Sequence, residues 1–541
     1  MRYIVLLVIN VLIAWPNFAQ TLPVVKANTK QVSIRDGKVF QKNIWNLSPE
    51  IKPDVYQALE PIVPKCITFY TDIDSVSFAV SSGKTYDFLV VLNQKDTCYT
   101  RISTIKPVSK KPVNVAVDKP LAPALLQEDF RTFREALQKH HAGLYTYKSK
   151  QAINRLLDSC ARALKKPMSP LEFGKTILWV ISAIEDGHTG SNLPRLLMAH
   201  YNDHQKVFPL YPYFVDNKAY VLCGGAQGLP PGTELLAING KPIGEIAKEI
   251  YRYLPSDGAI MSKKRQQLND GAFPIMYHWL LGGKAMFKVK YKAKNGAMQT
   301  INLVGKAVKD FKCEYQNRQN NTKPLQLTQL NTKTALLSVK SFDEGRLSSA
   351  KVDFAKFLDS AFIALNTQKT ANLIIDVRDN GGGEDNYGAL LYSYLSQKPF
   401  RYFFLKASTT HVVKPKENPL LGTQSPKNNS FKGKVYILTN GRSFSTTADF
   451  CATARSNDRA IFIGEETGGG YYGNTSGGRM DVTLPNSQIV AFVPLFKYLN
   501  AVKKAKYANR GIIPDYTIIP SIDDLLQHKD AELAFALGLI K

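Results

Sequence analysis

The spacing of apolar and polar residues changes several times along this chain of 541 residues. Residues 20–105 hold short runs in which apolar and polar positions alternate, separated by turn residues such as Asp-Gly and Ser-Ser-Gly. Alternation of period two is typical of half-buried strands, so the pattern predicts a small antiparallel N-terminal β domain. We expect this domain to serve recognition or only structural packing. The expected strands read QVSIR, CITFYT, VSFAV, YDFLVVL and CYTRIS.

The pattern changes to helical after residues 106–123, a stretch rich in proline and lysine that is predicted to be a linker. Residues 124–205 then place apolar residues three and four positions apart, which predicts helices. The helical runs read DFRTFREALQKHHAGLY, INRLLDSCARAL and PLEFGKTILWVISAI. Residues 206–305 return to strand-like runs, and we expect a separate domain there.

Strand and helix patterns alternate in residues 325–541, which predicts an α/β core with a mostly parallel sheet. A strand-rich tail is expected to follow the last predicted strand. The elements expected in this core are strands at 334–342, 371–380, 434–440 and 460–466, and helices at 347–365, from residue 387, and at 443–454.

A cluster of hydroxyl residues falls at one strand-to-helix turn of this core. Asn440 and Gly441 end a buried strand, and a helix is expected to begin near Ser443. The first turn of a helix offers unpaired N–H groups and a positive dipole end to a developing oxyanion, so a serine here suits nucleophilic catalysis. Ser443 is equally suited to simple N-capping.

Three segments of the core resemble the tail-specific, or C-terminal processing, peptidases and the tricorn core protease. They are DVRDNGGG at 376–383, YILTNGRSFSTTADF at 436–450 and IGEETGGG at 463–470. The resemblance implies that Ser445 is the nucleophile. It also implies that the N–H of Thr446 forms one half of the oxyanion hole and Gly381 or Gly382 the other. Ser443 is the principal rival for the nucleophile, because the register of a Ser/Thr-rich turn can slip by two residues.

The catalytic base of the tail-specific branch is a lysine, but glycine stands at its place in residues 464–470. The segment AIEDGHT at 183–189 resembles instead the DGHT segment of the tricorn-like branch, in which a histidine is the base. The resemblance therefore implies His188 as base, and the near-neutral pKa of histidine suits this role. Without the resemblance, His188 could equally be a turn residue with solvated nitrogens.

A third catalytic member stays open. Relatives often carry a glutamate before a segment that reads NRGIIPD here, at 509–515, but Ala508 occupies that position. Glu465 and Glu466 are possible substitutes as the acid that orients the imidazole, whereas Asp186 is expected to cap the turn that carries His188.

The resemblance implies a multidomain α/β protein with a crotonase-like (ClpP/crotonase) peptidase core, a helical segment, an N-terminal β domain and a PDZ-like domain. The segment LPPGTELLAINGKPI at 229–243 resembles a PDZ element, although Asn-Gly between apolar runs is also a general hairpin signal. The implied function is an exported serine endopeptidase that acts on peptides or proteins without metal or organic cofactor. The alternative is a catalytically inactive ligand- or peptide-binding protein on the same scaffold, as in the interphotoreceptor retinoid-binding protein.

Residues 1–19 hold an early Arg, an apolar run and a small residue before Gln20, which predicts a signal peptide cleaved after about Ala19 and a periplasmic or secreted location. No later apolar run is long enough to span a bilayer. The formal net charge of +26 favours contact with anionic envelope surfaces. The lysines of the chain are scattered and are not interleaved with aromatic residues on one element, so nucleic acid is not expected as a partner. The sequence predicts no oligomeric state.

The six cysteines, at 66, 98, 160, 223, 313 and 451, show no metal-binding spacing. Cys66 and Cys98 could pair within the N-terminal domain, and isolated buried thiols are the alternative.

Two other motifs match only in part and predict no site. Residues 468–473 satisfy G-x-G-x-x-G, but a turn-rich stretch follows where a nucleotide site needs a helix. Residues 441–445 end in serine where G-x-S-x-G needs glycine.

Overall fold

The computed structural model describes residues 118–540, except 225–228, 312, 314, 316–321 and 506–507, and seven strands between residues 24 and 104. The chain divides into two compact units, Met1–Val115 and Ala116–Lys541. The second unit contains the helical segment, the 206–305 segment and the core together. The predicted signal peptide lies outside the described residues, as does most of the predicted linker. None of the helices described is long and apolar enough to cross a membrane.

The first unit contains two small sheets, with strand orders β1-β7-β6-β4 and β3-β2-β5. Each expected strand has a counterpart, but the unit is not wholly antiparallel, because β1 pairs with β7 and β4 with β6 in parallel. Alternation of apolar and polar residues along a strand indicates which of its faces is exposed. It does not indicate whether the neighbouring strand runs parallel or antiparallel. The strands are β1 (Val24–Ala27), β2 (Gln31–Arg35), β3 (Lys38–Gln41), β4 (Lys65–Phe69), β5 (Ser75–Ala79), β6 (Thr85–Leu92) and β7 (Asp96–Thr104).

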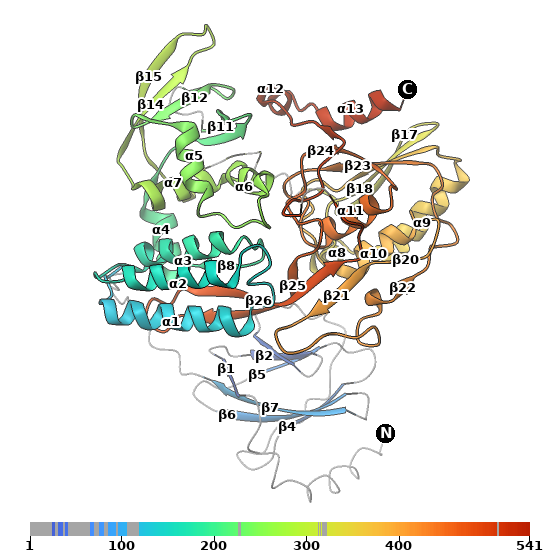
Figure 1. Ribbon diagram of the computed structural model, residues 1–541, viewed down its shortest axis with the longest axis horizontal. Helices are drawn as coiled ribbons and strands as arrows, with labels where there is room; N and C mark the ends of the chain where they lie inside the picture. Colours follow the sequence, from blue (N-terminus) through green and yellow to red (C-terminus); the bar gives the residue numbers. More distant parts are fainter. Residues whose placement is uncertain are drawn as a thin grey trace, which may run out of the picture. The chain divides into compact units, whose positions relative to one another are not determined.

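Three helices open the second unit at the predicted places: α1 (Pro123–His140), α2 (Lys150–Ala163) and α3 (Pro170–Ile184). A capping box between Ser169 and Glu172 begins α3, so the sequence defines this helix start locally. The helices pack side by side against β26 (Val490–Asn500), and their apolar faces form one core with residues of that strand (Figure 1). The segment continues into β8 (Gly190–Asn192) and α4 (Arg195–His204).

The next segment holds a sheet of order β10-β11-β12-β14-β15, with β13 paired to β12. The turn between β12 and β13 has Asn239 and Gly240 at positive φ, as an Asn-Gly hairpin requires. The strands are β9 (Lys206–Val207), β10 (Tyr211–Val215), β11 (Lys218–Cys223), β12 (Glu234–Ile238), β13 (Lys241–Pro242), β14 (Met286–Lys292), β15 (Met298–Val304) and β16 (Lys306–Ala307).

Four helical elements lie between residues 243 and 281 of this segment, which was expected to be strand-rich. They are α5 (Ile243–Tyr251), α6 (Met261–Gln267), the π-helical turn η4 (Leu268–Ala272) and α7 (Phe273–Leu281). The sequence MSKKRQQ of α6 has no apolar stripe, and FPIMYHWLL of α7 is apolar on nearly every side. Neither shows the three- and four-residue spacing that identifies a helix, so the pattern misses both.

The core sheet has the order β17-β18-β19-β23-β24-β27, in which only β17 runs antiparallel to its neighbour. The prediction of a mostly parallel sheet is confirmed. Successive residues of β19 and β23 enter two different apolar cores, so the sheet is buried on both faces and its strands read as continuous apolar runs. The strands are β17 (Leu325–Asn331), β18 (Thr334–Val339), β19 (Asn372–Asp376), β23 (Lys434–Thr439), β24 (Ile461–Gly464) and β27 (Tyr516–Thr517).

Two boundaries in this core differ from expectation. The single helix expected at 347–365 is two helices, α8 (Glu344–Ser349) and α9 (Phe354–Thr367), because Lys351 adopts positive φ and Asp353 caps the start of α9. The tail holds β25 (Thr475–Thr483) and β26, but ends in helices α12 (Ile522–Leu526) and α13 (Ala531–Leu539). Helix α13 packs on β23 and β24. The remaining elements are α10 (Asp385–Ser393), β20 (Phe400–Arg401), β21 (Phe403–Ala407), β22 (Thr423–Gln424) and α11 (Thr446–Ser456).

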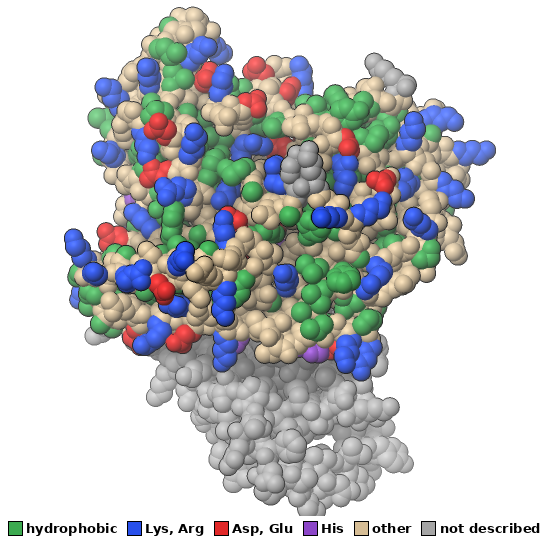
Figure 2. Space-filling view, viewed as in Figure 1, with side chains coloured by type: hydrophobic (Ala, Val, Ile, Leu, Met, Phe, Trp, Pro, Cys, Tyr) green, Lys and Arg blue, Asp and Glu red, His purple; other side chains and the backbone are tan. Residues whose placement is uncertain are grey.

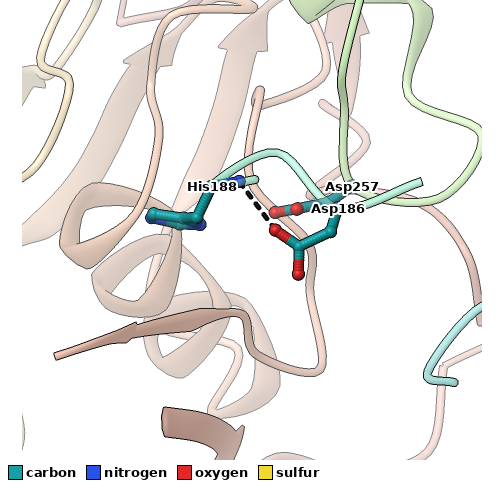
Figure 3. Close-up of side chains that lie close together, drawn as sticks. All are labelled: Asp186, His188 and Asp257. Atoms are coloured by element: carbon teal, nitrogen blue, oxygen red, sulfur yellow. Dashed lines mark hydrogen bonds between the residues drawn. The ribbon is translucent and has the colours of Figure 1, made fainter. Parts of the chain in front are cut away.

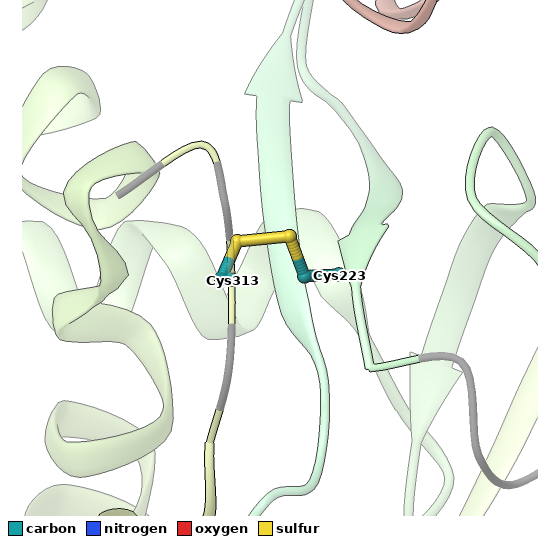
Figure 4. The surroundings of a disulfide bond; sticks show 2 residues. All are labelled: Cys223 and Cys313. Carbon is teal, nitrogen blue, oxygen red and sulfur yellow. A yellow bond between two sulfur atoms is a disulfide. The ribbon is translucent and has the colours of Figure 1, made fainter. Parts of the chain in front are cut away.

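A disulfide joins Cys223, at the end of β11, to Cys313, 90 residues later (Figure 4). The sequence does not predict this disulfide, because the spacing of the two cysteines gives no sign that they meet. Cys160 and Cys451 are buried free thiols, as the alternative of isolated thiols expects. The side chains of Cys66 and Cys98 lie outside the described part of the chain.

Arg378 ties the end of β19 to α13. Its guanidinium contacts Asp376 at 2.8 Å, Asp530 at 2.7 Å and Glu532 at 3.1 Å, and the side chains of Asp376 and Glu532 are only 6% and 5% exposed. Removing one partner of a buried ion pair leaves an uncompensated charge, which is strongly destabilising.

We therefore expect Arg378→Met to lower the free energy of unfolding by about 3–5 kcal/mol, measured by urea denaturation followed by intrinsic fluorescence. Lys503→Met is the matched control, because Lys503 pairs with Asp458 at a site where both side chains are more than two-thirds exposed. Its cost should stay below about 1 kcal/mol. Equal costs for the two variants would contradict this account of the network.

Candidate active site

Ser445 stands at the turn between β23 and α11, immediately before the first residue of the helix. Its backbone has φ 55° and ψ −130°, a conformation that a residue with a side chain rarely adopts. Although Ser445 is the N-cap residue, its hydroxyl makes no capping hydrogen bond to the helix. The hydroxyl is therefore held at the turn without being used for capping, contrary to the usual role of serine there.

His188 meets this hydroxyl across 257 residues of sequence. Its Nε2 lies 3.1 Å from Ser445 Oγ, and its ring stacks on Phe444 with 4.4 Å between centroids. The loop that carries His188 follows α3, and Asp186 Oδ1 accepts hydrogen bonds from the backbone N–H groups of His188 at 2.8 Å and Thr189 at 3.0 Å (Figure 3). Asp186 thus caps the turn, as expected from the sequence, and fixes the backbone from which the imidazole projects.

Ser443 is placed differently. It is fully buried, its Oγ donates to the carbonyl oxygen of Val377 at 2.9 Å, and it accepts from the N–H of Asn440 at 3.1 Å. Both hydrogen-bonding functions of this hydroxyl are satisfied by backbone. Of the two serines, only Ser445 therefore has a hydroxyl directed at an imidazole.

Burial lowers the pKa of His188 to about 3, and the positive charge of Lys263 adds to this effect, while Asp186 opposes it. The imidazole is therefore neutral at pH 7 and can accept a proton at Nε2 if Nδ1 carries the ring hydrogen. That Nδ1 is buried and has no hydrogen-bond partner among the described residues.

Neither Glu465 nor Glu466 is directed at His188. Glu465 binds Arg265 at 2.6 Å and Gln266 at 2.7 Å and accepts from the N–H of Gly441. Glu466 binds Arg510 through two hydrogen bonds. Both carboxylates hold loops of the site in place. The sequence does not predict these pairings, because Arg265, Gln266 and Arg510 lie 44 to 200 positions from the glutamates that they bind.

The acids beside the imidazole are Asp186 and Asp257. One carboxylate oxygen of each and a ring nitrogen of His188 all lie within 4.8 Å of one another (Figure 3). Asp257 accepts from the N–H of Gly187 at 2.7 Å and of Gly470 at 3.2 Å, and Asp186 also accepts from the hydroxyl of Thr475. These hydrogen bonds show that both carboxylates hold the loops around His188 in place.

The backbone N–H groups of Gly381 and Thr446 lie near Ser445 and have no acceptor within the part of the chain that the structure describes. The N–H of Gly382 donates to Asn380 Oδ1 at 3.0 Å. Gly382 instead supplies close approach, because a Cβ there would lie 2.7 Å from that of Ser445, and its φ is 103°. Among the predicted oxyanion-hole residues, Gly381 and Thr446 thus have N–H groups available.

Residues 333–518 match the model of peptidase family S41. The chain carries an S41 peptidase domain. This domain includes Ser445 and the glycine turn but begins after His188, and the family identifies the chain as a serine-type peptidase. A search of curated proteins found no match.

The chain is similar in fold to the structure of mature CPAF complexed with lactacystin, with 14% identity and a TM-score of 0.56 over 77% of this chain and 97% of that one. A second structure of mature CPAF gives 13% identity and a TM-score of 0.53 over 74% and 94% of the two chains. At such identities the likeness shows the fold.

Substituting Ser445 and substituting Ser443 should have opposite effects on covalent labelling of the site. Ser445→Ala should abolish covalent labelling by a fluorophosphonate probe, located by mass spectrometry. Ser443→Ala should keep labelling at Ser445 and lower the free energy of unfolding by about 1–3 kcal/mol, because the N–H of Asn440 loses its acceptor. Loss of labelling in a folded Ser443→Ala variant, with labelling retained in Ser445→Ala, would reverse the assignment.

Proposed function

We propose that this S41 peptidase is an exported endopeptidase in which His188 activates Ser445. The observation that carries the proposal is the 3.1 Å contact between His188 Nε2 and the otherwise unused hydroxyl of Ser445. A weak nucleophile needs a base within hydrogen-bonding distance, and a neutral imidazole supplies it.

In the proposed reaction, Ser445 Oγ attacks the carbonyl carbon of a peptide bond while its proton passes to His188 Nε2. The N–H groups of Gly381 and Thr446 donate to the oxyanion of the tetrahedral intermediate. The imidazolium then returns the proton to the leaving amine as the C–N bond breaks. Water hydrolyses the acyl-enzyme by the same steps, again with His188 as base.

No carboxylate in the described structure hydrogen-bonds to the His188 ring, so the imidazolium must be stabilised otherwise. Asp186 and Asp257 supply two negative charges, each with a carboxylate oxygen within 4.8 Å of a ring nitrogen of His188. The imidazole is oriented by the capped backbone of its loop and by stacking on Phe444. We propose that these contacts replace the acid of a Ser-His-acid triad, in which a carboxylate holds the imidazole.

The 206–305 segment is the proposed peptide-binding part, as a PDZ-like domain. The support is its sheet, in which β15 is an edge strand that pairs with β14 and with no other described strand. An extended peptide can add to such an edge through main-chain hydrogen bonds.

The activity is tested by incubating the purified protein with an unfolded protein substrate and identifying cleaved internal peptide bonds by mass spectrometry. Ser445→Ala and His188→Ala should each lower the rate by at least about a thousandfold, whereas Lys503→Met should match the wild type. A folded wild-type protein that binds peptides but neither cleaves them nor reacts with a fluorophosphonate would favour a binding protein on the same scaffold.

Export is supported by the predicted signal peptide and by the disulfide between Cys223 and Cys313, since disulfides form in oxidising compartments. The Lys and Arg side chains lie spread over the visible surface among acidic ones, which supports diffuse contact with anionic envelope polymers (Figure 2).

We expect the protein isolated from the periplasm or medium of its host to begin near Gln20. A non-reducing peptide map should link Cys223 to Cys313 and show Cys160 and Cys451 as free thiols. Recovery of the full-length, reduced chain from the cytoplasm alone would contradict export.

A further inference from the structure

One short segment, residues 255–267, contacts three of the loops around the site. Asp257 accepts from the N–H of Gly187 in the His188 loop and of Gly470 in the loop after β24. Arg265 and Gln266 bind Glu465, which in turn accepts from the N–H of Gly441 in the nucleophile turn. The segment belongs to the helical insertion before β14, outside the 333–518 match.

Lys263, in α6, makes the most direct of these contacts with the base. Its Nζ donates to the carbonyl oxygen of Gly187 at 3.1 Å, one residue before His188. The same ammonium lies 2.9 Å from the centroid of the Phe444 ring, on which the His188 ring stacks. Since Phe444 immediately precedes Ser445, Lys263 contacts the immediate neighbours of both proposed catalytic residues.

We propose that Lys263 is a positioning residue for the proposed reaction, whose ammonium group holds the His188 loop through Gly187, lies against Phe444 and places a positive charge near the imidazole. The inference rests on the proposed roles of His188 and Ser445. It assigns a function in catalysis to α6, a helix that packs no apolar stripe into a core and is held by polar contacts of this kind.

The charge of Lys263 acts on His188 together with those of Asp186, from the same loop, and His141, which follows α1. Asp257, from the loop before α6, also lies close, with a carboxylate oxygen within 4.8 Å of a ring nitrogen of His188. Burial lowers the pKa of Lys263 to about 8, against the opposing effect of Asp257 and Asp186, so the amine is mostly charged at pH 7. A cation beside an imidazole disfavours its protonation.

Two substitutions separate the charge of Lys263 from its hydrogen bond. Lys263→Gln keeps a donor and removes the charge, whereas Lys263→Arg keeps the charge. Lys264→Gln is the matched control on the same helix, because Lys264 Nζ donates away from the site, to the carbonyl oxygen of Tyr251.

The experiment measures the rate of fluorophosphonate labelling of Ser445 from pH 3 to pH 9 for the wild type and the three variants, each shown by circular dichroism to be folded. The acid limb of the wild type should lie below pH 5, since the pKa of His188 is lowered to about 3. In Lys263→Gln the midpoint of this limb should rise by about one pH unit, because removing a positive charge makes the imidazolium easier to form. Lys263→Arg and Lys264→Gln should keep the wild-type midpoint.

A folded Lys263→Gln variant with the wild-type midpoint, or Lys264→Gln with the larger shift, would overturn the role of Lys263 and leave the proposed function standing. If Lys263→Gln does not fold, a shifted midpoint in Lys263→Arg would equally overturn it, and an unshifted one would support it. Wild-type labelling that is absent, or that persists in His188→Ala, would instead refute the proposed function itself.

Discussion

The site depends on a single contact, between the imidazole of His188 and the hydroxyl of Ser445, that no local feature of the chain can form. One partner follows a helix of the segment before the sheet domain, and the other precedes a helix of the parallel core. A hydrogen bond contributes only about 1 kcal/mol to stability, too little to hold two loops against their conformational entropy. The surrounding hydrogen bonds to carboxylates and the packing of two cores supply the rest.

Carboxylates are the main means by which these loops are fixed. Asp186, Asp257, Glu465 and Glu466 each accept at least one backbone N–H of a loop around the site, and the two glutamates also bind arginines. A carboxylate that accepts such bonds defines the path of the backbone without occupying the position where substrate must enter. The strain at Ser445 is tolerated because Gly382 leaves space for its Cβ and because its own carbonyl oxygen accepts from the N–H of Ala448 at 2.8 Å.

The sequence predicts the helices and strands whose pattern lies within a short stretch of residues. The helices α1 to α3 and the buried parallel strands follow from spacing and apolar runs, and Ser445 and His188 follow from motifs of a known family. The prediction missed α6 and α7, whose sequences lack helical spacing, and with α6 it missed Lys263. It left Glu465 and Glu466 open as the orienting acid, although they bind Arg265 and Arg510, because ion pairs between distant segments leave no trace in the spacing of residues.

The disulfide between Cys223 and Cys313 brings the two ends of a long segment to a Cα–Cα distance of 5.5 Å. The segment between them contains Asp257, Lys263 and Arg265, and it lies in the chain between the proposed base and the proposed nucleophile. An insertion whose ends meet can be lengthened, shortened or exchanged by changing only its two junctions, while the host fold keeps its course. The covalent link therefore fixes both ends of the segment from which Asp257 and Arg265 reach the loops around the serine and the histidine.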